Sequence, residues 1–441
     1  MSKDQQPTFN IKKNIVYSFL IKGLSIFTSF LLVPLTVKYV NTVQYGIWLT
    51  IASLVSWINN FDIGLGNGLR NRIAASMAKN EQEGISRLIS TTYILLFFIA
   101  ASIFAVFFVV GSFFNWNSLL NISDSVGFNI WPVIVIATAF FCAQFVLQPI
   151  NNILTAFHQP FKAALISLSG QIITLTATFV LTRYTTGTLF ILVFVVSGAP
   201  VLTLGLSSLF LFLTKLRAFK PQLKAVDRSS AKSLLGLGTA FFFVQIGALV
   251  LYETDNIIIT RTIGPAEVST FNFAYKYFSI LILAFNIIIT PYWSAFTDAF
   301  ARDDQQWIKA AVKKLRLIWL LISAASIILY FGSGLFYRIW LGENVMIPAS
   351  LSLSMAVYVV VQNWMLIHSY FLNGTGKLKI QLILVIGTGI VNVPLSVFLI
   401  KRAGVCGTVW ANVIVMGFMS LIFTYQYRLL INKQATGIWN K

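Results

Sequence analysis

Long, unbroken runs of apolar residues recur along the whole chain, and they restrict its possible folds more than any other feature. A helix needs roughly 20 residues to cross a hydrocarbon core about 30 Å thick, and these runs reach that length. Inside a bilayer a spanning segment must satisfy its own backbone hydrogen bonds, as a helix does. The runs are continuous rather than alternating, so they do not fit the strands of a membrane barrel. The sequence therefore predicts an all-α integral membrane protein.

We expect about twelve transmembrane helices. The composition agrees, because 57% of the residues are hydrophobic and 10% are charged, against roughly 45–50% and 25% in soluble domains. The first run is already of spanning length, so no cleavable signal peptide is expected. The predicted spans are residues 14–37, 43–66, 88–113, 127–149, 162–182, 187–213, 233–259, 266–290, 315–336, 349–372, 379–400 and 405–429.

Basic residues are distributed unevenly among the loops between these spans. If the N-terminus is inside, most of the 32 lysines and arginines fall in inner segments, above all in residues 214–232. The positive-inside rule therefore predicts a multi-pass protein with both termini in the cytoplasm. This distribution also accounts for the net charge of +19. Nucleic acid is not expected as a partner, because no loop alternates basic with exposed aromatic residues.

The second half of the chain repeats the first. A shift of 223 residues, and later of 217, superimposes short segments that fall at equivalent places in the two halves. Six spans per half is an even number, so both halves enter the membrane in the same direction, as in transporters built from parallel repeats. We therefore expect two six-helix bundles related by a pseudo-two-fold axis, at residues 1–213 and 233–441, joined by a basic cytoplasmic linker at 214–232. The aligned segments are 42–48 with 265–271, 78–87 with 301–310, Gly170 with Gly387 and Gly187 with Gly404.

Four motifs carry a resemblance to a known family: TVQYGIW at residues 42–48, FDIGLGNGLRNRIA at 61–74, TDNIIITRTIGPAEVSTFNFAYK at 254–276 and GTGKLK at 374–379. In this order and spacing, the chain resembles the polysaccharide flippases of the multidrug/oligosaccharidyl-lipid/polysaccharide exporter superfamily over essentially its whole length. The resemblance implies a transporter without enzymatic activity or cofactor, located in the bacterial cytoplasmic (inner) membrane. Its implied cargo is an undecaprenyl-diphosphate-linked O-antigen or capsule unit, moved to the outer leaflet by alternating access. Membrane lipids and polysaccharide-assembly proteins are the implied partners.

Two departures from the family pattern bear on the fold and the cargo. Family members commonly have a Gly-Pro turn after the first span of each half. Here Gly264 and Pro265 keep it in the second half, whereas Asn41 and Thr42 replace it in the first. The count of twelve spans is lower than in lipid II flippases of the superfamily, which favours a carrier of O-antigen or capsule units.

The charge of the expected cargo suggests which residues bind it. A diphosphate is anionic, so its path needs cations in a hydrated cavity, whereas a carrier of cationic drugs needs acids there. Candidate substrate-binding residues are Lys22 and Lys276, within predicted spans, and Arg261 at the outer mouth. For Lys22, snorkelling to the inner interface is an equal alternative.

Acidic residues near these cations are candidates for coupling or ion pairing. Glu253 and Asp255 lie near the outer end of the seventh span, and Asp62 lies near the inner end of the second. We predict that Glu253 or Asp255 pairs with Lys276 when no substrate is bound and that the diphosphate competes for the lysine. A permanent structural ion pair is the alternative. Candidates for an inner gate are Arg70 and Arg72, and an ordinary position at the membrane interface is at least as good an interpretation of them and of Asp62.

Polar residues within the spans give a weaker signal, because each is able either to line a hydrated path or to bond across helices. These residues are Asn59, Asn60, Gln144, Gln148, Gln245, Asn256, Asn272, Asn286, Gln362, Asn363 and Asn392.

Two other classes of protein remain as alternatives. A cation-coupled multidrug antiporter of the same superfamily would differ in the sign of its cavity charge. A membrane glycosyltransferase, polymerase or acyltransferase would be expected to have a large outer loop or a histidine beside an acid. No metal site is predicted, because the two cysteines and two histidines lack metal-ligand spacing. The energy source stays open among an ion gradient, the membrane potential and removal of the product outside.

Overall fold

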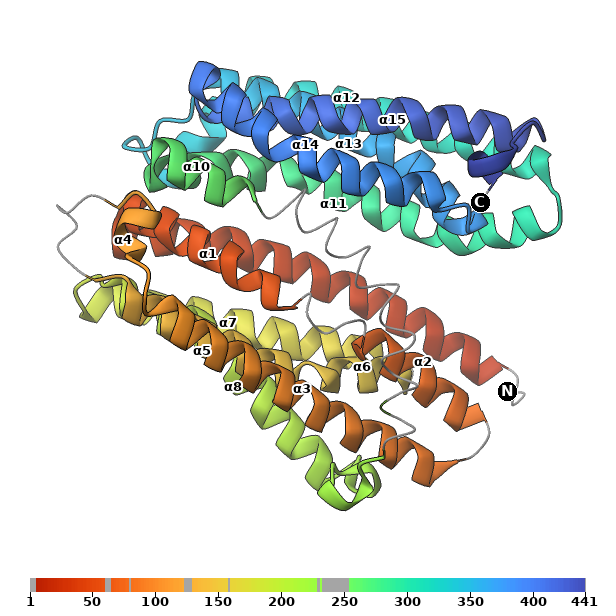
Figure 1. Ribbon diagram of the computed structural model, residues 1–441, viewed down its shortest axis with the longest axis horizontal. Coiled ribbons are helices and arrows are strands. Elements are labelled where there is room, and N and C mark those ends of the chain that lie inside the picture. Colours follow the sequence, from red (N-terminus) through yellow and green to blue (C-terminus); the bar gives the residue numbers. More distant parts are fainter. Residues whose placement is uncertain are drawn as a thin grey trace. The chain divides into compact units, whose positions relative to one another are not determined.

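A computed structural model of the chain describes residues 5–59, 65–78, 81–122, 129–157, 159–227, 231 and 254–440. Throughout these ranges the regular elements are helices, arranged in two compact units, Met1–Ile246 and Gly247–Lys441 (Figure 1). Ten of the described helices are long and apolar enough to cross a membrane. The predicted all-α membrane fold is confirmed.

The difference between ten spans and the predicted twelve has two origins. One observed segment, Leu20–Val55, covers most of the first two predicted spans, which join at a kink inside a single helix. The seventh predicted span, 233–259, lies mostly outside the described residues. The other nine predictions each match a helix of the structure.

The N-terminal unit is built around the helix α1, which packs against α5 and α7, while α8 covers α5 and α7. Helix α3 lies against α5 and α2. The helices of this unit are α1 (Gln5–Asn59), α2 (Leu65–Ala78), α3 (Gln82–Gly111), α4 (Trp116–Leu119), α5 (Trp131–Leu147), α6 (Pro149–Ala156), α7 (Pro160–Tyr184) and α8 (Leu189–Leu213).

In the C-terminal unit, α13 is the central helix and packs against α11, α12 and α15. Helix α14 packs on α15, and the short α10 lies against α11, α14 and α15. These helices are α10 (Asp255–Ile263), α11 (Pro265–Ala301), α12 (Gln305–Leu341), α13 (Ala349–Thr375), α14 (Lys379–Ala403) and α15 (Val405–Ile431), followed by a 3-10 turn at Gly437–Asn440.

Helix boundaries reproduce the sequence repeat. Helix α2 ends at Ala78 and α11 ends at Ala301, while α3 begins at Gln82 and α12 begins at Gln305. Both pairs of boundaries are separated by 223 positions, which is the shift found from the sequence. The same order of helices is therefore built twice.

The replaced turn in the first half keeps the backbone conformation of its counterpart. Asn41 has φ 74° and ψ 171° at the kink of α1, and Gly264 has φ 111° and ψ 163° between α10 and α11. With ψ near 170°, Asn41 lies outside the left-handed helical region that asparagine adopts readily, in a region that is almost confined to glycine, so its backbone is strained. The Asn41 side chain also accepts a hydrogen bond from the Gln44 backbone N–H at 3.1 Å, as a helix cap does. The lost Gly-Pro pair thus leaves the turn intact.

Residues that follow α8 return to pack on their own unit. Two 3-10 turns, Arg217–Phe219 and Leu223–Ala225, contact α3. The Gln222 and Asp227 backbone N–H groups donate to the hydroxyls of Ser90 and Thr91 at 3.0 and 3.1 Å. The observed division at 246 and 247 falls outside the described residues, and the predicted boundaries of the 214–232 linker stay a prediction.

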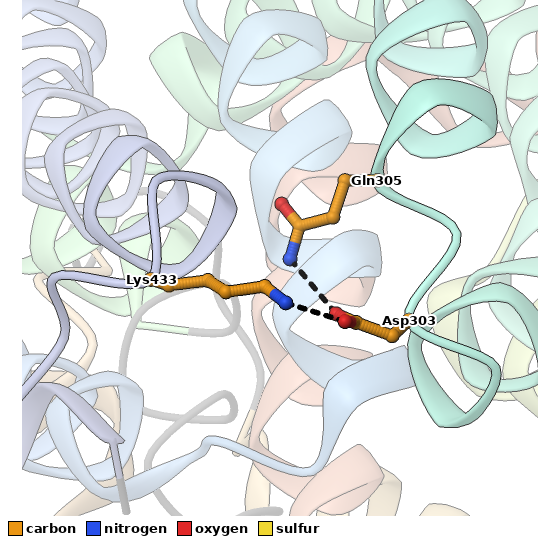
Figure 2. Close-up of polar contacts among 3 residues, drawn as sticks. All are labelled: Asp303, Gln305 and Lys433. Atoms are coloured by element: carbon orange, nitrogen blue, oxygen red, sulfur yellow. Dashed lines mark hydrogen bonds and ion pairs between the residues drawn. The ribbon is translucent and has the colours of Figure 1, made fainter.

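Polar contacts hold the residues after α15 against the turns that join other helices of the same unit. Lys433, after α15, forms an ion pair with Asp303 in the turn between α11 and α12, and the Gln305 side chain donates to the same carboxylate at 3.2 Å (Figure 2). The hydrogen bond from Lys433 holds the pKa of Asp303 below its usual value. The buried Gln426 amide donates to the carbonyls of Lys377 and Trp439, each at 3.1 Å. These contacts fix the C-terminal residues to two helix connections.

Candidate transport site

Two consecutive residues at the start of α10 hold this short helix against different neighbours. Asp255 is buried, with 6% of its surface exposed. Its carboxylate accepts a hydrogen bond from the Asn412 amide of α15 at 2.6 Å. The next side chain, Asn256, accepts from the Asn272 amide of α11 at 2.8 Å. Consecutive positions on a helix point about 100° apart, which allows α10 to bond to both helices at once.

A stripe of buried polar side chains extends from Asp255 between α14 and α15. The Asn412 carbonyl oxygen accepts from the Asn392 amide at 3.0 Å. One turn along each of these antiparallel helices lie Ser396 and Thr408, both fully buried. Within the described part of the chain, these two hydroxyls have no hydrogen-bond partner, and the Asn392 side-chain oxygen has none either. Such groups commonly mark a place where water or an ion is held, because burying them unpaired costs about 1–3 kcal/mol.

Lys276 lies on α11, one helical turn beyond Asn272, and its side chain is half-buried. Residues four apart share a helix face, and Asn272 bonds to α10, so Lys276 lies on the side of α11 that faces α10. It follows Pro265 by eleven residues, or about 16 Å at 1.5 Å per residue. A cation this deep in a membrane is costly without a counter-ion or water.

The other predicted site residues lie at exposed positions or outside the described residues. Lys22 is exposed on α1, and Arg261 is exposed in the last turn of α10. The gate candidates Arg70 and Arg72 are both exposed on α2. Glu253 and Asp62 lie outside the described residues.

The structure therefore gathers only part of the predicted set. Asp255 and Lys276 belong to neighbouring helices of the C-terminal unit, whereas Lys22, Arg70 and Arg72 belong to the N-terminal unit. The predicted ion pair of Glu253 or Asp255 with Lys276 stays a prediction. For Asp255 the structure shows a hydrogen bond from Asn412, which the sequence did not predict.

Sequence reasoning missed Asn412, which is an isolated amide in an otherwise apolar span. Nothing in the linear order connects it with Asp255, because 157 positions separate the two residues. The one available signal was the presence of a second amide, Asn392, in the preceding span.

A second polar cluster lies near the other end of the C-terminal unit. His368 is fully buried, with its Nε2 atom 3.4 Å from the Arg316 guanidinium and its Nδ1 atom 3.2 Å from the Trp364 carbonyl oxygen. The guanidinium also lies over the rings of Trp364 and Tyr427, at 5.2 and 5.8 Å. This histidine is hydrogen-bonded within the bundle. In the described ranges, no three His, Cys, Asp or Glu side chains group as they would around a metal ion.

Comparison with known sequences places this architecture in a family. The family model described as "Polysaccharide biosynthesis protein" matches residues 11–297. A protein of Yersinia pseudotuberculosis named for O-antigen export is 22% identical over 379 residues, which cover 81% of each chain. A Salmonella typhimurium protein named for O-antigen transport is 22% identical over 355 residues, which cover 78% of each chain.

Solved structures share the fold. An inward-facing multidrug resistance MATE family transporter of the MOP superfamily aligns with a TM-score of 0.72 and 17% identity, over 93% of this chain and 94% of that one. An outward-facing structure of such a transporter aligns with a TM-score of 0.61 and 18% identity, over 97% of each chain. At these identities the likeness concerns the fold alone.

Proposed function

Since the chain belongs to the polysaccharide biosynthesis protein family, we propose that it flips an anionic lipid-linked oligosaccharide across the bacterial cytoplasmic membrane. The cargo is an O-antigen or capsule repeat unit on undecaprenyl diphosphate, and it moves by alternating access between the two leaflets. The chain acts as a transporter and not as an enzyme. Support comes from the family match and from relatives named for O-antigen export and transport.

The observation that carries this proposal is the position of Lys276. Its ammonium group lies within a spanning helix, on a face that also carries the hydrogen-bonded amide of Asn272. A diphosphate is held most strongly by charge-assisted hydrogen bonds from such cations. Lys276 therefore contacts the diphosphate, Lys22 and Arg261 are further cationic contacts along its path, and Arg70 and Arg72 serve as an inner gate.

Asp255 gives the site a means of coupling. In this proposal, Glu253 or Asp255 neutralises Lys276 when substrate is absent, and the arriving diphosphate displaces the acid. The polar stripe from Asp255 to Asn392 then supplies hydrogen-bonding groups for the released carboxylate. Asp62 is a further coupling candidate in the N-terminal unit.

A cation-coupled multidrug antiporter is the second candidate function. The observation that favours it is the buried carboxylate of Asp255, in a fold shared with multidrug resistance transporters. The two functions differ in cargo charge, and a cationic drug would be attracted to Asp255 rather than to Lys276.

Deleting the gene separates these functions. For a flippase, we expect surface polysaccharide to fall and the lipid-linked unit to accumulate on the cytoplasmic side, with no change in sensitivity to cationic drugs. Both are measured in the deletion strain and in a strain complemented with the intact chain. Normal surface polysaccharide together with increased drug sensitivity would instead identify the antiporter.

Topology is tested by labelling single cysteines with an impermeant maleimide. Both native cysteines, Cys142 and Cys406, are buried, so the background is expected to be low. Lys224 is exposed in the predicted cytoplasmic linker, and Tyr184 is 82% exposed at the predicted outer end of α7. We expect Tyr184→Cys to be labelled in intact cells and Lys224→Cys only after the cells are opened. Labelling of Lys224→Cys in intact cells would reverse the assigned orientation.

A further inference from the structure

A cavity of about 430 Å³ lies between α11 and α12, in the part of the C-terminal unit that is nearest to the turn joining these helices. Its walls combine one basic residue, three aromatic or proline rings and three alanines. The lining residues are Pro291, Tyr292, Ala295, Trp307, Ala310, Ala311 and Lys314.

This cavity lies at the edge of the membrane. The spans predicted from hydropathy are 266–290 on α11 and 315–336 on α12, and every lining residue falls between them, outside the apolar segments. Each helix has 37 residues, or about 55 Å at 1.5 Å per residue, which exceeds the roughly 40–45 Å of a bilayer with its headgroups. The helices therefore extend past the hydrocarbon, and the cavity lies at the level of the lipid headgroups.

Three lysines of α12 lie at this level without an acidic partner among the described residues. Lys314 lines the cavity, and Lys309 and Lys313 are exposed on the same helix. Throughout the described residues, no ion pair joins any of these three lysines to a carboxylate. The charge of Lys314, which borders the cavity, is therefore available to an anion from outside the protein.

Acidic residues close by in sequence are already engaged. Asp298 pairs with Arg302 at 3.0 Å, and Asp303 pairs with Lys433. The Asp304 carboxylate accepts from the Trp307 backbone N–H at 2.9 Å and so caps α12. None of these acids is available to neutralise Lys314.

Aromatic rings form cavity walls that suit the part of a lipid next to its phosphate. Trp307 is 39% exposed, and its ring lies 6.0 Å from that of Phe296, edge to face. The Tyr292 ring lies 6.0 Å from the same phenylalanine. Tryptophan and tyrosine are enriched at the membrane interface because each has an apolar body and a polar group. These walls leave a space bordered by small alanine side chains.

We propose that this cavity binds the anionic phosphate headgroup of a membrane lipid, with Lys314 at the phosphate and the rings of Trp307 and Tyr292 against the adjoining carbons. The shared chemistry fits two sources, a phospholipid of the surrounding leaflet and an isoprenoid diphosphate. The assignment holds whether or not the chain transports polysaccharide.

The test is a binding titration of the purified chain, in which native mass spectrometry detects the bound lipid. The probes are dioleoyl phosphatidylglycerol, farnesyl diphosphate and the zwitterionic dioleoyl phosphatidylcholine. We expect Lys314→Gln to weaken the first binding step of an anionic probe about fivefold, since one lysine near the surface contributes on that scale. Ala310→Phe, which fills the cavity, should weaken it at least as much. Lys309→Gln is the matched control on the same helix and should leave it nearly unchanged.

Each outcome decides the proposal. Loss of phosphatidylglycerol binding alone identifies a phospholipid site, and loss of farnesyl diphosphate binding alone identifies an isoprenoid site. Equal effects of Lys309→Gln and Lys314→Gln would overturn the assignment, because they would show general surface attraction. Equal affinity of the intact chain for phosphatidylcholine would overturn it as well. Melting temperatures of the variants distinguish lost binding from lost folding.

Discussion

Replacing Lys276 with glutamine is expected to reduce export of surface polysaccharide by about tenfold or more, while the abundance of the protein in the membrane stays normal. The reason is the loss of a charge-assisted hydrogen bond to the diphosphate, which is worth about 1.5–3 kcal/mol. Lys276→Arg keeps the charge and should restore export in part. Surface polysaccharide and membrane abundance are measured in the same cells.

Two further variants sharpen this prediction. Lys401→Gln removes a cation that is exposed at the end of α14 and should change nothing. Lys22→Gln should reduce export if Lys22 faces the transport path. It should leave export unchanged if the side chain only snorkels to the membrane interface. Full export by the Lys22→Gln, Lys276→Gln double variant would show that neither lysine binds cargo.

The second large effect is expected at Asp255. Asp255→Ala removes the acceptor of the Asn412 amide and leaves that buried donor without its 2.6 Å bond. Loss of such a partner costs about 1–3 kcal/mol, so this variant should lose stability as well as export. Asp255→Asn keeps an acceptor oxygen for Asn412 and removes only the charge. It should fold normally and lose export by about tenfold or more if the carboxylate exchanges with the diphosphate.

Stability and export are therefore measured separately for these variants, by melting temperature in detergent and by surface polysaccharide. Asn412→Ala is the partner variant, since it removes the same hydrogen bond without removing the charge, and it also removes the acceptor of the Asn392 amide. If Asp255→Asn exports normally while Asp255→Ala and Asn412→Ala are both unstable, Asp255 serves only to hold α10 against α15.

A charge exchange separates a structural ion pair from a pair that the substrate opens. The Asn412 bond makes Asp255→Lys disruptive in itself, so Glu253→Lys combined with Lys276→Glu is the more informative exchange. Recovery of abundance without export would support competition by the diphosphate. Recovery of both would show a permanent structural pair.

Much of the fold could be predicted from the sequence, because bilayer thickness and backbone hydrogen bonding leave few alternatives for long apolar runs. The repeat was also visible, since a shift of 223 positions aligns residues 78–87 with 301–310 and the helix boundaries follow it. The turn at Asn41 shows that a missing motif does not always mean a different backbone conformation. A missing Gly-Pro pair suggested a departure, yet asparagine adopts the same positive φ.

The candidate site could be predicted only in part. Lys276 and Asp255 were identified because charged residues are rare in apolar spans. Their partners could not be, because a contact such as that between Asp255 and Asn412 depends on how two helices are rotated about their axes. Amphipathic patterning fixes that rotation in soluble bundles, whereas a helix that is apolar on all sides carries little such information. The cavity beside Lys314 could not be predicted either, because it depends on how the ends of α11 and α12 pack against each other.

Translocation by the purified chain in sealed vesicles tests the central claim most directly. Vesicles containing an undecaprenyl-diphosphate-linked oligosaccharide are treated with an impermeant glycosidase, which cleaves only the oligosaccharide exposed on the outer leaflet. A flippase is expected to make the inner-leaflet pool accessible as well, so that cleavage goes beyond the level in protein-free vesicles, and the Lys276→Gln variant should slow this step. Cleavage limited to the protein-free level, together with uptake of a cationic drug by the same vesicles, would contradict the account.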